Sequence, residues 1–395
     1  MAAENVRAEV GEIGPLDGLR GLAVAWVIAF HVYALRAKLG DPWVDLMASS
    51  RFLEPMVGAG YLGVDLFFLI SGFLLALPWF VHAAQGKRAP SSSGFYARRV
   101  RRIVPAYYVQ LVILFVVVLP LLRGPGYWRS DLYVYLYNVV AHALFLHNTT
   151  PLTSGSMQVN GALWTLAVEA QFYILIPLVV PLFVRWTHAA LAASFALAIL
   201  WHIGVDAGLD AIVAAEMAFG AHWGWPESIV RYLLLHQLPS YFAHFALGIV
   251  LGGAWLRWRA AEPPRVERAL VAVAAACALA VLYRFMAIDG RLLGELTWIV
   301  APLCLAVLLF WAVTTHWSFV QRLLARGPLA FLGRVSYSAY LYHLPLLLVW
   351  NAYAHALPAW TSLPLYLAAL LALAWLSWRF VEQPFLQKQV VSGTT

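Results

Sequence analysis

Long apolar runs constrain the fold of this 395-residue chain more than any other feature. About ten runs come close to the roughly 20 mostly apolar residues that an α-helix needs to cross a bilayer. Hydrophobic residues make up 63% of the chain and charged residues 11%, whereas a soluble domain carries about a quarter charged residues. The runs are too long and continuous for the alternating strands of a membrane β-barrel. The sequence therefore predicts an all-α, polytopic membrane helical bundle. The expected spans are 16–36, 60–82, 103–122, 163–184, 189–206, 233–256, 268–286, 292–315, 330–352 and 361–382.

A further apolar segment, 131–148, is interrupted by Asn138, His142 and His147. We interpret it as interfacial or re-entrant, because counting it as a span would invert every later loop. The basic cluster 257–268 would then lie outside, against the positive-inside rule.

With the N-terminus in the cytoplasm, most Lys and Arg residues fall in cytoplasmic loops, as this rule requires. We therefore expect a multi-pass protein of the plasma (inner) membrane with both termini cytoplasmic. Residues 1–15 are expected to form a cytoplasmic segment, 16–385 the integral membrane domain, and 386–395 a cytoplasmic tail.

Two ionisable residues, Arg20 and His31, occur in the first run. Eleven helical residues make about three turns, so the two side chains lie on nearly the same face, about 16 Å apart along the axis. Ionisable groups inside a membrane helix are expensive to insert and usually mark a function. A fixed cation near one surface and a titratable imidazole further in would suit an anionic ligand and a proton transfer.

Four arginines precede the third run, among them Arg98, Arg99 and Arg102. Such a cluster can be a topology signal that contacts anionic lipid headgroups. Arginine at every position also suits bidentate phosphate recognition. A nucleotide-bearing donor such as coenzyme A would use a site of this kind.

Other polar residues lie within the apolar runs. Asp65 and Ser71 in the second run form either a packing face or part of a site, because a carboxylate in hydrocarbon needs a partner. Glu169, close to Trp164 at the start of the fourth run, is rarely found in a membrane helix unless it pairs or works.

A third polar set lies in the ninth run. Ser336, Tyr340 and His343 are spaced i, i+4 and i+7 and share one helix face. They could line a cavity, or they could form hydrogen bonds between helices. The two readings are equally open at this point.

Several chemistries find no support in the sequence. The histidines show no metal-ligand spacing, and zinc-protease, nucleophile-elbow and phosphate-loop motifs are absent. Cys277 and Cys304 lie in apolar runs and are expected to be small core residues. We expect no metal, no permanently bound cofactor and no nucleic-acid partner.

Taken together, the polar blocks resemble the acyltransferase-3 family of integral membrane O-acyltransferases. The resemblance covers most of the chain and depends on the order of the blocks: Arg20 with His31, then 63–73, 98–108, 164–172, 336–343 and 381–384. The last block has Gln383 where a basic residue is common in the family. The chain looks like the stand-alone type, without a C-terminal hydrolase-like domain.

The resemblance implies transfer of an acyl group, often acetyl, from cytoplasmic acyl-CoA to a hydroxyl. The acceptor would be a glycan, a glycolipid or a macrolide-like metabolite. By the same resemblance, His31 is the expected general base, while Arg20, Arg98, Arg99 and Arg102 handle the donor. We expect Glu169 to assist catalysis by orienting the imidazole, and Asp65, Ser71, Trp164, Tyr340 and His343 to be substrate-binding or structural.

Two other functions remain compatible with these residues. A transporter of a small polar or lipid-linked molecule would also bury His, Asp and Glu, but it needs no phosphate-binding cluster. A non-catalytic membrane scaffold fits least well, because buried ionisable groups are costly. Oligomeric state, acceptor and acyl chain length are left open by the sequence.

Overall fold

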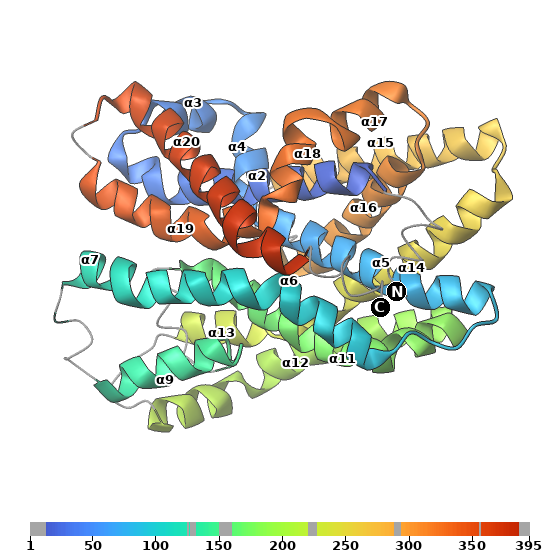
Figure 1. Ribbon diagram of the computed structural model, residues 1–395, viewed down its shortest axis with the longest axis horizontal. Helices are drawn as coiled ribbons and strands as arrows, with labels where there is room; N and C mark the ends of the chain where they lie inside the picture. Colours follow the sequence, from blue (N-terminus) through green and yellow to red (C-terminus); the bar gives the residue numbers. More distant parts are fainter. Residues whose placement is uncertain are drawn as a thin grey trace.

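The protein is described by a computed structural model that covers residues 13–124, 126, 132–149, 160–219, 227–287, 294–354 and 357–386. All regular structure in these residues is helical, as the apolar runs predict. Most of the long helices lie side by side along the horizontal axis of Figure 1. They are α2 (Pro15–Arg36), α5 (Leu62–Ala84), α6 (Ser92–Ile113), α11 (Trp164–Arg185), α12 (Thr187–Phe219), α14 (Leu238–Ala261), α15 (Arg265–Ala287), α16 (Gly294–Thr314), α19 (Ser336–Tyr353) and α20 (Ala359–Ser377).

Within the described residues, nine helical segments are long and apolar enough to cross a membrane. They correspond to nine of the expected spans. The remaining one, 330–352, is divided at Val335 into α18 (Gly327–Arg334) and α19. The Ser, Tyr and His side chains of α19 lower its mean hydropathy. Ser338 and His343 are fully buried, so the bundle interior rather than lipid surrounds them.

Shorter helices connect the long ones. Near the left-hand end of Figure 1 lie α3 (Pro42–Ser49), α7 (Leu119–Arg123) and α9 (Leu132–Ala143). The remaining short helices are α4 (Leu53–Gly58), α13 (Glu227–Leu235) and α17 (Ser318–Ala325). Single turns are η1 (Ala37–Leu39), η4 (Gly161–Leu163) and two π-helical turns, η2 (Leu114–Val118) and η5 (Trp378–Glu382). With 12 residues, α9 is about 18 Å long. It is too short to cross a bilayer, in agreement with an interfacial or re-entrant segment.

The centre of the bundle is the contact between α5 and α14, whose backbones approach closely. A methyl group added to Gly72 would lie 2.1 Å from the carbonyl oxygen of Phe245, and one added to Gly248 would lie 2.1 Å from that of Leu69. Only glycine fits at these positions, as in other close membrane-helix contacts. This contact fixes α5, the helix along which the candidate site is built.

The first helix, α2, packs against α5, α18 and α19. It begins at the same end of the bundle as the α5–α6 connection, because Gly14 and Arg20 share a cavity with Leu77 and Pro78 near the end of α5. We call this end, which also carries Arg98, Arg99 and Arg102, the arginine end. The α14–α15 connection lies there too, on the right in Figure 1.

Candidate functional site

A cavity of about 290 Å³ opens at the arginine end and follows α5 through the bundle. Its α5 wall includes Pro78, Leu74, Ser71, Phe67 and Val64, a stripe spaced three or four residues apart. From Pro78 to Val64, this stripe rises by about 21 Å. The cavity therefore reaches from the arginine end most of the way along a membrane-spanning helix.

Four cationic side chains line the entrance to this cavity: Arg20 from α2, and Arg98, Arg99 and Arg102 from α6. They are the residues expected to handle the donor, and the fold brings all four together. The Nε of Arg99 is buried without a hydrogen-bond partner. An ion pair partly offsets their charge, because Asp17 lies 3.9 Å from Arg20. A buried, unpaired guanidinium donor in a cationic cavity is suited to an anionic ligand.

Glu169 of α11 also lines the cavity. Its carboxylate accepts a hydrogen bond of 2.7 Å from the Ser71 hydroxyl and another from the Tyr173 hydroxyl. The expected contact between Glu169 and His31 is not found among the described residues, where the ring contacts of His31 are to other groups. Glu169 lines the same cavity as the four arginines, and its negative charge reduces their mutual repulsion.

The far end of the cavity is formed by Tyr340 of α19 and Thr165 of α11. Their hydroxyl oxygens are 2.8 Å apart, and the Tyr340 hydroxyl also lies 3.1 Å from the carbonyl oxygen of Ala162. Ser336, one turn before Tyr340, lines the cavity as well. Two members of the polar face expected on the ninth run are thus cavity-lining residues.

The third member, His343, lies behind Tyr340 and contacts His31, from which it is separated by 312 positions in sequence. Its Nε2 lies 3.3 Å from Nδ1 of His31, and its Nδ1 lies 2.7 Å from the carbonyl oxygen of Tyr340. His31 Nδ1 also lies 2.9 Å from the carbonyl oxygen of Val27. His343 is completely buried and His31 is half-buried.

These contacts assign the tautomers of both rings. A carbonyl oxygen only accepts hydrogen bonds, so Nδ1 of His343 and Nδ1 of His31 carry the protons. His343 Nε2 then accepts from His31, and Nε2 of a neutral His31 is left with a free lone pair. A neutral imidazole oriented by a second group in this way can act as a general base.

Helix α20 holds both histidine-bearing helices. The Tyr366 hydroxyl donates a hydrogen bond of 2.9 Å to the carbonyl oxygen of His343. Ser362, one turn earlier, accepts from Arg36 at the end of α2 and from Trp350 of α19, at 3.0 and 3.1 Å. The relative position of α2 and α19 therefore depends on α20.

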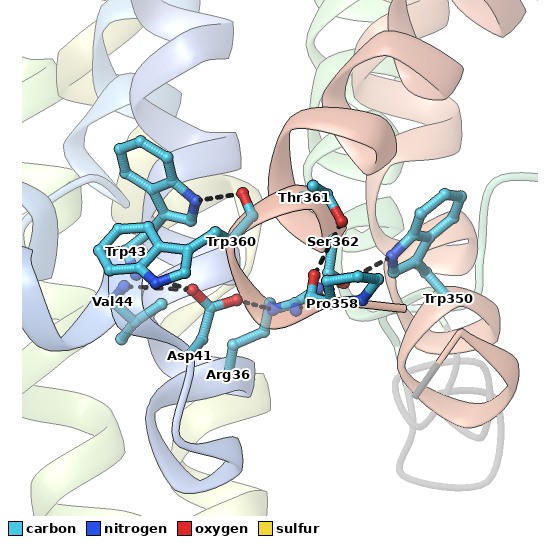
Figure 2. A network of polar contacts seen from close by, with 9 residues as sticks. All are labelled: Arg36, Asp41, Trp43, Val44, Trp350, Pro358, Trp360, Thr361 and Ser362. Atoms are coloured by element: carbon cyan, nitrogen blue, oxygen red, sulfur yellow. Dashed lines mark hydrogen bonds and ion pairs between the residues drawn. The ribbon is translucent and has the colours of Figure 1, made fainter. Parts of the chain in front are cut away.

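Arg36 is also part of a buried ion pair, which Figure 2 shows next to the start of α20. Its Nε lies 2.6 Å from Oδ2 of Asp41, and the side chains are only 8% and 1% exposed. Asp41 in turn caps α3 by accepting from the backbone N–H groups of Trp43 and Val44. Sequence reasoning missed this pair, although Asp41-Pro42 is a recognisable helix start.

The two remaining candidates lie outside the cavity. Asp65 is buried against His244 of α14, with 3.5 Å between Oδ1 and Nε2, so its partner is a histidine and not an arginine. Trp164 packs edge-on against His236 and near Tyr241. Among the described residues, no group of three or more His, Cys, Asp or Glu side chains could hold a metal ion.

Sequence reasoning also missed Thr165 and Tyr173, two further polar residues of the cavity lining. Tyr173 could have been found from its spacing, because it lies one turn after Glu169 on the same helix face. Thr165 gave no such signal, since its importance depends on the approach of Tyr340 from α19.

Comparison with known proteins adds the following findings. The family model described as an acyltransferase domain, that of the acyltransferase-3 family, matches residues 13–379. The chain is 26% identical over 385 residues to the peptidoglycan O-acetyltransferase OatA of Listeria monocytogenes, covering 93% of this chain and 55% of that protein. It is 28% identical over 399 residues to the putative peptidoglycan O-acetyltransferase YrhL of Bacillus subtilis, covering 93% and 54%. The chain spans about half the length of these relatives. No solved structure matches it significantly.

Proposed function

The chain belongs to the acyltransferase-3 family of membrane O-acetyltransferases, and we propose that it moves an acetyl group from acetyl-CoA to a hydroxyl of a cell-envelope glycan, with His31 as the general base. This proposal depends mainly on the cavity, which extends from four arginines at one end of the bundle to Tyr340 at the far end of the cavity. The His343–His31 pair lies directly behind Tyr340. A transporter needs no such phosphate-binding entrance, so family and site together favour the enzyme.

The donor would enter at the arginine end, which we place in the cytoplasm together with both termini. The positive-inside rule supports this orientation, because the arginine clusters 98–102 and 257–268 share this end. Arg98, Arg99 and Arg102 would bind the phosphates of the donor, with Arg20 deeper in the cavity. The buried, unpaired Nε of Arg99 is a hydrogen-bond donor for one of them.

The pantetheine arm would lie along the apolar wall of α5 and carry the thioester towards Tyr340. The cavity ends at Tyr340, and His31 is not among its lining residues. The Tyr340 ring must therefore turn aside for the thioester carbonyl to reach the imidazole. The acceptor would approach His31 from the opposite end of the bundle.

In the transfer step, the acceptor hydroxyl oxygen attacks the thioester carbonyl carbon while His31 Nε2 takes its proton. The carbon–sulfur bond then breaks, and the leaving thiolate recovers the proton from His31. The products are the O-acetyl ester and coenzyme A, and no acyl-enzyme intermediate is required. The Val27 carbonyl keeps His31 in the reactive tautomer, and the hydrogen bond to His343 stabilises the imidazolium. The two relatives carry names that describe them as a peptidoglycan O-acetyltransferase and a putative one. These names favour a glycan acceptor over a macrolide-like one.

The test is acetyl transfer from radiolabelled acetyl-CoA to a soluble peptidoglycan fragment by the purified protein in lipid nanodiscs. His31→Ala should lower kcat by about 10²- to 10⁴-fold, because it removes the base, and leave the melting temperature near that of the wild type. Wild-type turnover in this variant would refute the assignment. The matched control is His82→Ala, since His82 lies near the end of α5 and outside the cavity.

The proposed donor site is tested with arginine variants in the same assay. Arg99→Gln should raise the KM for acetyl-CoA about tenfold, the loss expected for one charge-assisted hydrogen bond. Arg101→Gln removes the same charge from an exposed position of α6 that does not line the cavity, and it should leave KM unchanged. Equal KM values for the two variants would contradict the phosphate-binding role.

A further inference from the structure

A second cavity, of about 530 Å³, lies between the end of α14, the start of α15 and the end of α16. We call it the α15 groove. Trp258, Arg265, Arg268, Ala272, Trp311 and Trp317 are among its lining residues, and it shares none with the cavity that carries the proposed reaction. The α14–α15 connection puts it at the arginine end (Figure 1).

The groove is basic at one end. Arg265 and Arg268 begin α15, and neither forms an ion pair with an acidic side chain in the part of the chain that the structure describes. The Nε of Arg268 is buried without a hydrogen-bond partner. The free backbone N–H groups at the start of α15 add partial positive charge. A ligand here would therefore carry an anionic group with several acceptor oxygens.

Apart from Thr314, Thr315 and His316, the rest of the groove is lined by apolar side chains. Helix α15 is mostly uncovered: Val266, Leu270 and Val273 are 60–70% exposed. In a spanning helix, such side chains meet lipid acyl chains. Of these three, Val273 lines the groove, where the short side chain of Ala272 leaves a furrow. Trp258, Trp311 and Trp317 supply the amphipathic rings typical of a membrane interface. A water-soluble anion would leave this apolar part empty.

We propose that the α15 groove binds an anionic glycerophospholipid, with its phosphate on Arg265 and Arg268 and an acyl chain along α15 past Ala272. Charge and position together determine this occupant: the arginines require an anion, and the uncovered α15 face requires an alkyl chain at the lipid boundary. The site is separate from the donor cavity, so its occupancy does not depend on the proposed acetyl transfer.

The test is native mass spectrometry of the detergent-solubilised 395-residue protein, titrated with dioleoylphosphatidylglycerol or dioleoylphosphatidylcholine. We expect a bound phosphatidylglycerol with a clearly lower Kd than phosphatidylcholine. Arg265→Gln with Arg268→Gln should raise that Kd by about tenfold or more, since each arginine near the surface contributes about 1 kcal/mol towards an anionic lipid. Arg257→Gln with Arg326→Gln, an equal charge loss at exposed positions outside the groove, should leave the Kd unchanged.

A second variant, Ala272→Phe, fills the furrow and leaves both arginines in place, so that it should also weaken phosphatidylglycerol binding if the acyl chain lies there. The proposal is overturned if the arginine double variant binds phosphatidylglycerol as the wild type does, or if phosphatidylcholine binds equally well. Displacement of the lipid by millimolar inorganic phosphate would also overturn it, because the site would then recognise a free anion. Acetyl transfer by each variant in the same detergent reports separately on the donor cavity.

Discussion

The contact between His343 and His31 gives the sharpest prediction of the proposed mechanism. His343→Ala removes the acceptor of the His31 Nδ1–H at 3.3 Å, while the carbonyl of Val27 at 2.9 Å still holds that proton. The tautomer of His31 is therefore kept, and what is lost is the extra stabilisation of the imidazolium. His343→Ala should impair catalysis without abolishing it.

The size of the effect follows from the change in this hydrogen bond during the reaction. A neutral hydrogen bond contributes about 0.5–1.5 kcal/mol, and one to a charged group about 1.5–3 kcal/mol. The difference, about 1–2 kcal/mol, lowers the barrier because it is gained only as His31 takes up a proton. It corresponds to a loss of about 5- to 30-fold in kcat.

The assay is acetyl transfer in nanodiscs, with kcat and the KM for acetyl-CoA determined separately for His343→Ala and His343→Gln. We expect a lower kcat and an unchanged KM for the alanine variant. The glutamine variant should recover most of the activity, because its carbonyl oxygen can accept the same hydrogen bond. If His343→Ala were as inactive as His31→Ala at an unchanged melting temperature, His343 would itself carry the proton and the reasoning would be wrong.

Two further predictions concern charge inside the bundle. Glu169→Gln keeps the hydrogen bonds to Ser71 and Tyr173 but removes the negative charge beside the arginines, so this variant should have a lower melting temperature. Added coenzyme A should raise the melting temperature more in this variant than in the wild type, because phosphate replaces the missing charge. An equal ligand-induced shift in differential scanning fluorimetry would contradict this. Arg36→Met should destabilise the protein by about 3–5 kcal/mol, because it leaves the buried Asp41 carboxylate without its cation. The double variant with Asp41→Asn should recover most of this in thermal unfolding, and a strictly additive loss would show that the ion pair is not coupled.

The fold was predictable because its main determinant is local. An apolar run of about 20 residues is enough by itself to predict a membrane-spanning helix. Nine of the expected spans correspond to helical segments that meet this criterion. The ninth run is the exception. The position of α19 in the bundle interior depends on partners for Ser338 and His343, and Ser338 finds its own on Ser377 and Glu382 near the end of the chain. Such contacts leave no trace in the hydropathy of α19 itself.

The candidate site was predictable only in part, because the contacts between its helices are not encoded locally. Arg20, Arg98, Arg99 and Arg102 could be recognised because positive charge at a membrane helix is rare and clustered. The partners of the buried acids could not. Glu169 was expected beside His31, yet it lies with Ser71 and Tyr173, and Asp65 lies with His244. Which helices become neighbours decides these pairs, and single residues do not encode that choice.

The distance between Arg20 and His31 along α2 fits the two different roles that we propose for them. Arg20 and His31 share a helix, but Tyr340 and His343 of α19 lie between the cavity and the imidazole. In the proposed mechanism, these two side chains would keep water away from the thioester until the donor is bound. In our proposal, the eleven-residue spacing of Arg20 and His31 places donor binding and proton transfer on opposite sides of Tyr340 and His343. In the same proposal, only the acetyl group of the donor has to pass these side chains.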